Sequence, residues 1–265
     1  MGKKFVVLPT NEVIMLSKSA QKLIRSLEHK KYRQELGLFL AEGHKLTLDL
    51  LGKMPCRLLA ATNEWLDKNG NLCEKASEIV ITEKAILEKI SLQKNPQDVL
   101  GIFEIPDYNI KPSDLKGMLS LALENIQDPG NLGTIIRIAD WFGISYLICS
   151  KDTVDAFNPK TVQATMGAIS RMKILYTDLI TFLPQAGLPV YGTFLEGDII
   201  YNCKLPQEAI IIMGNEGKGI SKQVTPLVDN KIFIPDFPVG KSGSESLNVA
   251  VATAIVCSEF RRRCN

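Results

Sequence analysis

The sequence predicts an α/β protein in which a small α/β domain precedes a larger domain built on a parallel sheet. Three observations predict this class. Short apolar runs alternate with helical patterns along the 265 residues, as in strands separated by helices. Runs of the second half, such as MLSLALENI and AIIIM, are almost continuously apolar, which is typical of strands covered on both faces. Between the halves, the two prolines of PDYNIKPSDLKG indicate a linker.

The composition is that of an ordinary soluble globular chain, with 45% apolar and 23% charged residues. No apolar run approaches the roughly 20 residues of a membrane span. The start, MGKKFVVLPTNE, lacks the pattern of a signal peptide, so we expect a cytoplasmic protein. Six scattered cysteines form no CxxC pair, and His29 and His44 are the only histidines. We therefore expect reduced thiols and no metal site.

In the first half, a helical segment begins with Ser17 as its cap, has Leu23, Ile24 and Leu27 at helical spacing, and ends at Gly37. Strands are predicted in LGLFLAEG, CRLLAAT, SEIVIT and VLGIFEIP, and helices in HKLTLDLLGKM and EKAILEKISL. These elements predict a first domain over residues 1–105, followed by a linker over 106–115.

Positive charge is concentrated in this first domain. Residues 1–105 carry 16 Lys and Arg against 13 Asp and Glu, whereas residues 106–265 carry 15 against 16. Six cations crowd one short segment: Lys18, Lys22, Arg25, Lys30, Lys31 and Arg33. Such a density can neutralise several phosphates of a nucleic acid. A solvated helix face is the alternative interpretation of the same residues.

The second domain, residues 116–265, alternates strands and helices again. Strands are predicted in MLSLALENI, SYLICS, LPVYGTFLEG, AIIIM and KIFIPDF, and helices in GNLGTIIRIADWFGI, NPKTVQATMGAISRM and ESLNVAVATAIVCSEFRRR. Three strands run into unusual loops: ENIQDPGNLGT, MGNEGKGIS and IPDFPVGKSGSESLN. Ligands of parallel sheets bind at the carboxyl ends of the strands, so these loops form one pocket if they converge.

The glycine-rich loop of IIMGNEGKGIS matches neither common nucleotide-binding pattern. Gly214 and Gly219 have the spacing of a phosphate-binding loop, but Ile220 stands where its lysine is required. A dinucleotide pattern beginning at Gly217 would need a third glycine where Lys222 stands. Backbone must nevertheless approach something closely in this loop, so a different ligand is expected.

Taken together, the three loops resemble the motifs of the SpoU (TrmH) family of the SPOUT class, whose members methylate RNA with S-adenosylmethionine. NIQDPGNLGTIIRIADWFG is similar to the first motif, IIMGNEGKGIS to the second, and IP…SLNVAVATAI to the third. NPKTVQATMGA, between them, also resembles the family. The resemblance covers about residues 116–263, and LFLAEGHKLTLDLL resembles the substrate-binding domain that precedes the catalytic domain in ribosomal-RNA members.

The resemblance implies an α/β knot, a homodimer, and transfer of a methyl group to a ribose 2′-hydroxyl, with ribosomal RNA expected before transfer RNA. Three positions depart from the family pattern. The loop DFPVGKSGSE is longer than usual, Ile138 stands where a small hydroxyl residue is common, and Ala250 replaces a serine.

Cofactor-binding residues follow from the resemblance. It implies that Gly214, Ile234 and Leu247 offer backbone groups to the cofactor, with Asn215 and Gly217 in the same glycine loop. Glycines leave backbone N–H and C=O groups open to an adenine edge. Turn geometry alone is the alternative reason for the glycines.

Five residues are the expected catalytic set: Arg137, Asn131, Glu216, Ser246 and Asn248. A guanidinium stays charged up to about pH 12, so Arg137 is expected to fix a phosphate and stabilise the developing alkoxide. Glu216 would orient Arg137, and Asn131 would hold Arg137 or the RNA. Each has a structural alternative: an ion pair of Arg137 with Asp140, and helix caps formed by Asn131, Glu216 or Ser246.

Several functions remain open beside RNA 2′-O-methylation. The chain would be a non-catalytic RNA-binding or ribosome-assembly protein if the fold were kept without the chemistry, although the expected catalytic residues all remain. Methylation of a base is a neighbouring possibility. Phosphate transfer is disfavoured because the loop lacks its lysine.

Overall fold

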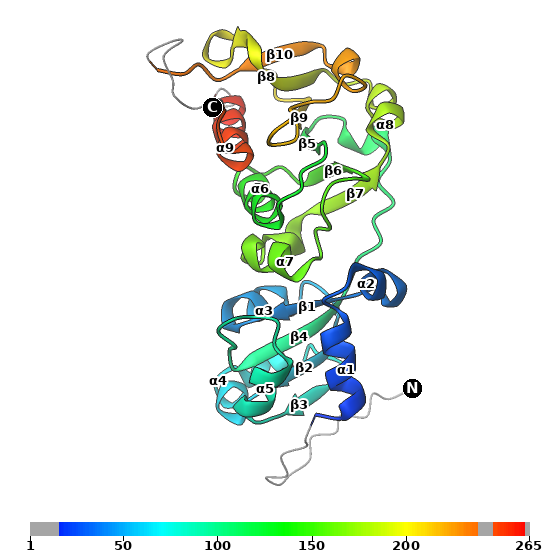
Figure 1. Ribbon diagram of the computed structural model, residues 1–265, viewed down its shortest axis with the longest axis vertical. Helices are drawn as coiled ribbons and strands as arrows, with labels where there is room; N and C mark the ends of the chain where they lie inside the picture. The colour runs from blue at the N-terminus through cyan, green and yellow to red at the C-terminus, as the bar shows by residue number, and fades with distance from the viewer. Residues whose placement is uncertain (1–15, 238–245, 263–265) are drawn as a thin grey trace. The chain divides into compact units, whose positions relative to one another are not determined.

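A computed structural model describes residues 16–237 and 246–262 of the chain. The chain divides into two compact units, Met1–Ile105 and Pro106–Asn265. Figure 1 shows the elements of each unit, coloured from blue near the N-terminus to red near the C-terminus. In the described residues, no helix combines the length and the apolar character needed to cross a membrane.

Unit 1 has a four-stranded sheet in the order β1-β4-β2-β3. β4 is antiparallel to β1 and β2, whereas β2 and β3 are parallel. Its elements are α1 (Lys18–Ser26), α2 (Lys30–Leu36), β1 (Leu38–Glu42), α3 (His44–Leu50), β2 (Cys56–Ala61), α4 (Asn63–Cys73), β3 (Ile79–Ile81), α5 (Lys84–Ile90) and β4 (Val99–Glu104). One apolar core lies between the sheet and the helices α1 and α5, which contribute Ile24, Leu27, Leu87 and Ile90 to it.

The first helical segment begins and ends where the sequence predicts, but it contains a break. Ser17 caps α1 by accepting a hydrogen bond from the Ala20 amide at 3.1 Å, and Gly37 ends α2 with a φ of 63°. His29 has extended backbone, φ −92° and ψ 130°, and separates the two helices. The sequence does not predict α4, because Gly70 and three asparagines weaken its helical pattern.

Glu42 is a buried carboxylate in β1, with 6% of its surface exposed. It accepts hydrogen bonds from the Ser91 hydroxyl and, at 3.0 Å, from the Leu92 amide. Burial raises the pKa of this carboxyl above its ordinary value, and the two hydrogen bonds oppose the rise only in part. The bonds tie the segment after α5 to the first strand.

The raised pKa of Glu42 predicts a pH-dependent stability of unit 1. Since the folded chain holds this proton more tightly than the unfolded chain, the stability it contributes is complete below about pH 4 and is lost as pH rises through the folded pKa. Glutamine does not titrate, so Glu42→Gln should gain stability relative to the parent chain between about pH 4 and about pH 7. Urea unfolding followed by the fluorescence of Trp65, which lies in this unit, measures both chains. A difference that is the same at both pH values would contradict the prediction.

Unit 2 has six parallel strands in the order β10-β8-β9-β5-β6-β7. Its elements are β5 (Leu119–Leu123), α6 (Pro129–Trp141), β6 (Tyr146–Ser150), α7 (Pro159–Thr165), β7 (Lys173–Thr177), α8 (Leu179–Ala186), β8 (Val190–Ile199), β9 (Ala209–Met213), β10 (Asn230–Phe233) and α9 (Val249–Arg262). The central strands β5 and β9 are buried along their whole length, as expected for a sheet covered on both faces. In Figure 1, α6 and α9 lie side by side on one face and α8 lies on the other.

The segment expected as a linker takes part in the core of unit 2. Ile110 and Leu115 are buried there against α8, and residues Pro112–Leu115 form a short 3-10 helix. The predicted linker therefore contributes apolar contacts to the second unit.

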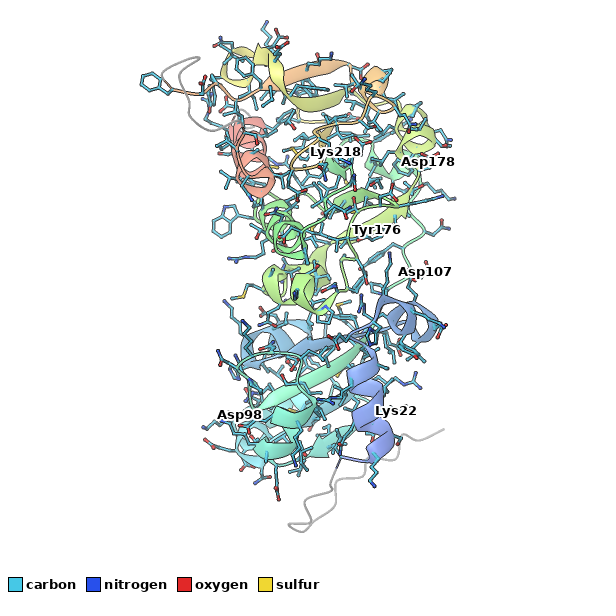
Figure 2. The ribbon with its side chains drawn as sticks, viewed as in Figure 1. Lys22, Asp98, Asp107, Tyr176, Asp178 and Lys218 are labelled. Atoms are coloured by element: carbon cyan, nitrogen blue, oxygen red, sulfur yellow. The ribbon has the colours of Figure 1, made fainter. Side chains whose placement is uncertain are left out.

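Local side-chain bonds fix the loops of this sheet. Asp178 caps α8 by accepting a hydrogen bond from the Ile180 amide at 3.0 Å (Figure 2). The hydroxyl of Tyr176 donates to the Val154 carbonyl at 2.6 Å and accepts from the Ala156 amide at 2.8 Å. Burial raises the pKa of Tyr176 far above its usual range, so the hydroxyl stays protonated and keeps the loop after β6 in place.

The helix predicted for NPKTVQATMGAISRM is shorter than expected. Asn158 caps it, but α7 ends at Thr165 because Met166 has a left-handed backbone with a φ of 50°. The sequence predicts neither β7 nor α8, both of which the structure contains.

Candidate functional site

The site lies where the chain order of the parallel sheet reverses. β5 leads outward to β6 and β7, and the chain then returns to β8 and β9 on the other side of β5. Such a reversal opens a crevice at the carboxyl ends of the two central strands. Leu123 of β5 pairs with Met213 of β9, so the loops that follow these strands begin at the same level.

Hydrogen bonds join the loop after β5 to the loop after β9. The Glu124 amide donates to the Met213 carbonyl at 2.9 Å. The Asn215 side chain donates to the Asn125 carbonyl at 2.8 Å, and the Glu124 carboxylate accepts from the Ser221 amide at 2.8 Å. Asn125 has a φ of 57°, a conformation that asparagine tolerates better than most residues. The two loops therefore form one floor.

The glycine loop after β9 is a tight reversal held by Asn215. The backbones of Asn215 and Gly219 exchange hydrogen bonds at 3.0 and 2.9 Å, and the Asn215 side-chain oxygen accepts from the amides of Gly217 and Lys218 at 3.0 Å each. A Cβ added to Gly214 would lie 2.3 Å from the Gly219 carbonyl carbon. Glycine is required at position 214 because the returning backbone occupies the space of a side chain.

A directed chain of side-chain hydrogen bonds connects all three motifs. The side-chain nitrogen of Asn248 donates to the side-chain oxygen of Asn131 at 2.9 Å. The side-chain nitrogen of Asn131 in turn donates to the Glu216 carboxylate at 3.1 Å. An ionised carboxylate only accepts, so Glu216 determines which way the Asn131 amide faces, and Asn131 then determines which atom Asn248 presents. We call Asn131, Glu216 and Asn248 the relay.

Replacing Asn131 by aspartate should break the relay while keeping the shape of the side chain. The variant would face Glu216 with a second carboxylate, and like charges at this distance raise the pKa of one of them. Losing a hydrogen bond to a charged group costs about 1–3 kcal/mol, so thermal unfolding at neutral pH should show a less stable chain. Lowering the pH restores a proton between the two carboxyls and should recover part of the loss. A loss that does not change with pH would contradict this account of the relay.

The residues that cap α6 and α9 are not the ones that the sequence analysis offered as caps. Asp128, rather than Asn131, caps α6, because its carboxylate accepts a hydrogen bond from the backbone amide of Asn131 at 2.7 Å. Asn248, rather than Ser246, caps α9, since its side-chain oxygen accepts from the backbone amide of Ala250 at 2.9 Å. The side chains of Asn131 and Asn248 therefore meet each other.

Arg137 lies outside the relay. It is exposed on the face of α6 that carries Trp141, one turn later, and it forms no hydrogen bond or ion pair within the described residues. The alternative ion pair with Asp140 is wrong, because Asp140 binds Arg171 in a fork with distances of 2.7 and 2.6 Å. Glu216 faces Asn131 rather than Arg137, so the expected Arg137–Glu216 pair does not form among the residues that the structure describes.

The third motif is described only at its two ends. Ile234 is half-buried just after β10, whereas Ser246 is exposed and Leu247 exposes 49% of its surface. Of the long loop noted in the sequence, residues 236–245, the part from 238 to 245 lies outside the described residues. Arg261 fixes the far end of α9 on α6 by donating to the Phe142 carbonyl at 2.8 Å.

One residue of the basic segment, Arg33, is not the exposed cation that the sequence analysis expected. Arg33 is buried, with 1% exposed, and donates to the carbonyls of Leu27 and Glu28 at 2.8 and 2.7 Å. It holds the turn between α1 and α2 and cannot reach RNA. The remaining five cations are exposed, namely Lys18, Lys22, Arg25, Lys30 and Lys31.

Sequence reasoning also missed three residues of the site. Glu124 and Asn125 bind the glycine loop, and Asp128 caps α6. Asp128 precedes Pro129, an acidic cap before a proline, and that signal could have identified it. No local pattern marks Glu124, because its partner Ser221 lies 97 positions away.

Comparison with protein families assigns both units. Residues 118–258 match the model of the SpoU rRNA methylase family, and residues 19–101 match the MRM3-like substrate binding domain. The first match covers more than half of the chain, so the chain belongs to the SpoU rRNA methylase family. The predicted family and its class of enzyme are confirmed.

Named relatives are similar over most of their length. A 23S rRNA guanosine 2′-O-methyltransferase of Bacillus subtilis is 28% identical over 89% of this chain and 94% of its own. The 23S rRNA guanosine 2′-O-methyltransferase RlmB of Neisseria meningitidis is 31% identical over 77% of this chain and 83% of its own.

Solved structures confirm the fold. A TrmH-family protein of Porphyromonas gingivalis superposes with a TM-score of 0.84 at 38% identity, covering 94% of this chain and 100% of its own. An AdoMet-bound rRNA methyltransferase of Sinorhizobium meliloti superposes with a TM-score of 0.83 at 31% identity, over 96% and 98%. The prediction of a SPOUT α/β-knot domain preceded by a smaller α/β domain is confirmed.

Proposed function

We propose that this chain transfers a methyl group from S-adenosylmethionine to a ribose 2′-hydroxyl of ribosomal RNA. The observation that carries the proposal is the relay, because it joins all three family motifs at the carboxyl ends of β5 and β9. The relatives support the substrate, since those of Bacillus subtilis and Neisseria meningitidis are named as 23S rRNA 2′-O-methyltransferases. Transfer RNA is the alternative substrate.

The glycine loop fits the proposed cofactor. Backbone fills the space beside Gly214, while Gly217 is exposed, and a Cβ added there would lie 3.9 Å from its nearest neighbouring atom. Backbone groups of this loop are thus open to a flat ligand edge. Gly214, Asn215, Gly217, Ile234 and Leu247 would hold the cofactor. When bound, it supplies a methyl group on a sulfonium.

In this proposal, side chains of the site position the ribose and stabilise the negative charge that develops on its oxygen. The ribose oxygen must lose its proton and meet the methyl carbon in line with the sulfur, so orientation contributes much of the rate. Arg137 fixes a phosphate of the RNA and stabilises the developing alkoxide. Glu216 and Asn131 hold the motif loops in register, and Ser246 and Asn248 contact RNA or cofactor at the start of α9.

A second copy of this chain completes the site in our proposal. Arg137 lies one turn before Trp141 on α6, and Trp141 exposes 85% of its surface. The helix packed against α6, α9, carries a second exposed apolar residue, Val251, which exposes 50%. Exposed apolar area beside a functional arginine favours association, and self-association would bring partner groups to Arg137. Sedimentation of the full chain should give the mass of a homodimer; a monomer at micromolar concentration would refute the dimer.

Unit 1, over residues 1–105, binds RNA in this proposal, and residues 116–265 carry the catalysis. The match to a substrate binding domain supports the first role. We place the protein in the cytoplasm, with ribosomal RNA as its partner.

Mapping of ribose methylation tests the function. Ribosomal and transfer RNA from cells with and without this chain should differ at one 2′-O-methyl position, which the purified chain restores with labelled S-adenosylmethionine. Alkaline hydrolysis separates the alternatives, because a 2′-O-methyl group protects its dinucleotide and a base methyl does not. If purified chain binds RNA but transfers no label, and no methylation is missing from the cells, the chain is a non-catalytic RNA-binding protein.

A further inference from the structure

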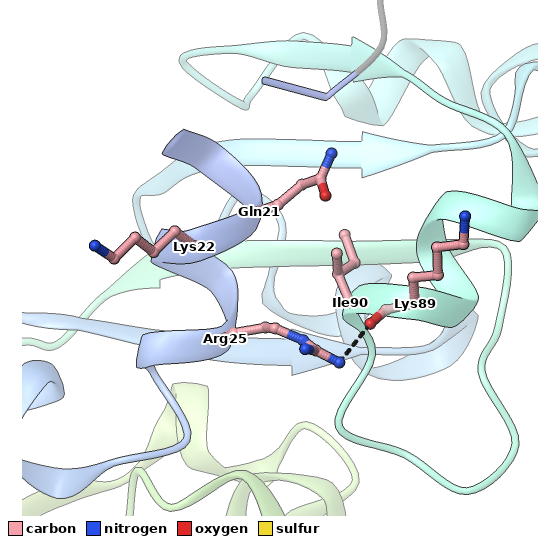
Figure 3. Close-up of a pocket in the computed structure, with 5 residues that line it drawn as sticks. All are labelled: Gln21, Lys22, Arg25, Lys89 and Ile90. Atoms are coloured by element: carbon pink, nitrogen blue, oxygen red, sulfur yellow. Dashed lines mark hydrogen bonds between the residues drawn. The ribbon is translucent and has the colours of Figure 1, made fainter. Parts of the chain in front are cut away.

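A cationic groove lies between α1 and α5 in unit 1. It has a volume of about 330 Å³ and is lined by Gln21, Lys22, Arg25, Lys89 and Ile90. Figure 3 shows Arg25 reaching from α1 to the backbone of Lys89, whereas the Lys22 side chain extends from α1 away from α5. Lys89 is 64 positions from Arg25, so the sequence alone could not group it with the basic segment.

Arg25 is positioned before any ligand arrives. One terminal nitrogen of its guanidinium donates to the Lys89 backbone carbonyl at 2.8 Å, the bond drawn in Figure 3. A guanidinium has five N–H donors in a rigid fork, so the other donors remain available to an anion. Holding the side chain in place beforehand lowers the entropy that binding would otherwise cost.

Among the described residues, no ion pair neutralises the two lysines of the groove. None of its lining residues is acidic, and Lys22 and Lys89 form no ion pair within the described residues. Other lysines of unit 1 do: Lys31 pairs with Glu35, Lys68 with Glu64, and Lys84 with Asp98. The groove therefore brings cations from two helices together without an ion pair among the described residues.

We propose that this groove binds the sugar-phosphate backbone of the substrate RNA, an inference that rests on the proposed function. Arg25, which reaches from α1 to the Lys89 backbone, and the Lys89 side chain meet one phosphate. Lys22 meets the next phosphate from α1. Phosphate is favoured over the carboxylates of an acidic protein because the groove belongs to the unit that matches a substrate binding domain.

The double variant Lys22→Gln, Lys89→Gln tests the groove in the full chain. Filter binding of purified 23S ribosomal RNA should weaken on the order of 10-fold, and the slope of log K against log salt should fall by about 1 for each lysine. The KM for RNA should rise by a similar factor. Both kcat and the Kd for S-adenosylmethionine should stay unchanged, since the substituted residues lie in unit 1.

Lys68→Gln, Lys75→Gln is the matched control, because it removes the same charge from exposed positions of unit 1 outside the groove. It should leave both the slope and the KM unchanged. An unchanged slope in the groove variant overturns the proposal, as does an equal loss in the control. If the groove variant instead loses affinity for poly-glutamate but not for RNA, the groove binds acidic protein and the proposal is wrong.

The two proposals fail separately. RNA that binds the groove without receiving a methyl group refutes the proposed function and leaves the groove intact. RNA that is methylated by the groove variant with an unchanged KM refutes the groove and leaves the function intact. Both substitutions are at exposed helix positions, and circular dichroism verifies that the variant is folded.

Discussion

Replacing Arg137 by alanine is expected to lower methyl transfer by at least about 10²-fold, the usual loss when a donor to a developing oxyanion is removed. The same change should hardly affect stability. Arg137 is exposed and has no hydrogen bond or ion pair within the described residues, and exposed substitutions of this kind change the free energy of unfolding by about 0.5 kcal/mol or less.

Two measurements separate the proposed role of Arg137 from a structural one. Calorimetric titration should give the Arg137→Ala chain a Kd for S-adenosylmethionine close to that of the parent, because the cofactor residues are on other loops. Arg137→Lys keeps the charge but loses the planar fork that binds phosphate, so it should recover only part of the activity. Loss of cofactor binding in the alanine variant would show that Arg137 has a different role.

Replacing Gly214 by alanine should have the largest effect on cofactor binding. The new Cβ would lie 2.3, 2.4 and 2.6 Å from backbone atoms of Gly219 and Ile220, and backbone cannot turn aside as a side chain does. Strain of this kind costs about 1–3 kcal/mol. We expect thermal unfolding at lower temperature and no measurable binding of S-adenosylmethionine, because the loop must open to make room for the alanine side chain.

Gly217→Ala is the matched control for Gly214→Ala. It adds the same methyl group to the same loop, but the nearest atom to its Cβ is 3.9 Å away. The chain should keep the stability of the parent within about 0.5 kcal/mol. Equal destabilisation of the two variants would contradict the steric explanation for Gly214.

The strands of unit 2 and the grouping of its loops could be predicted because their signals are local. Continuous apolar runs such as that ending at Met213 predict buried parallel strands, and such strands place their following loops at one edge. The relay could not be predicted, since Asn131 and Asn248 are 117 positions apart. Their residue types are equally compatible with helix caps, and only the packing of α9 on α6 distinguishes the two roles.

The basic segment shows where charge patterns mislead. Arg33 belongs to the same run of cations as the exposed lysines, yet it follows the break at His29 and is turned inward to the carbonyls of Leu27 and Glu28. Lys89 is overlooked for the opposite reason, because it is isolated in the sequence and joins Arg25 only through the fold. Tertiary packing sets both the helix break and the long-range neighbours, and these determine whether each cation is buried or belongs to the groove.

The link from Asn248 back to Asn131 has a consequence for synthesis on the ribosome. Domains emerge and fold from the N-terminus, so β5, α6 and β9 are translated well before Asn248. A nascent chain stopped ahead of position 248 would contain the bond between Asn131 and the glycine loop but lack the bond from the third motif to Asn131. Premature termination would therefore yield a protein whose donor pocket lacks its third motif, and such an incomplete enzyme could not consume the methyl donor.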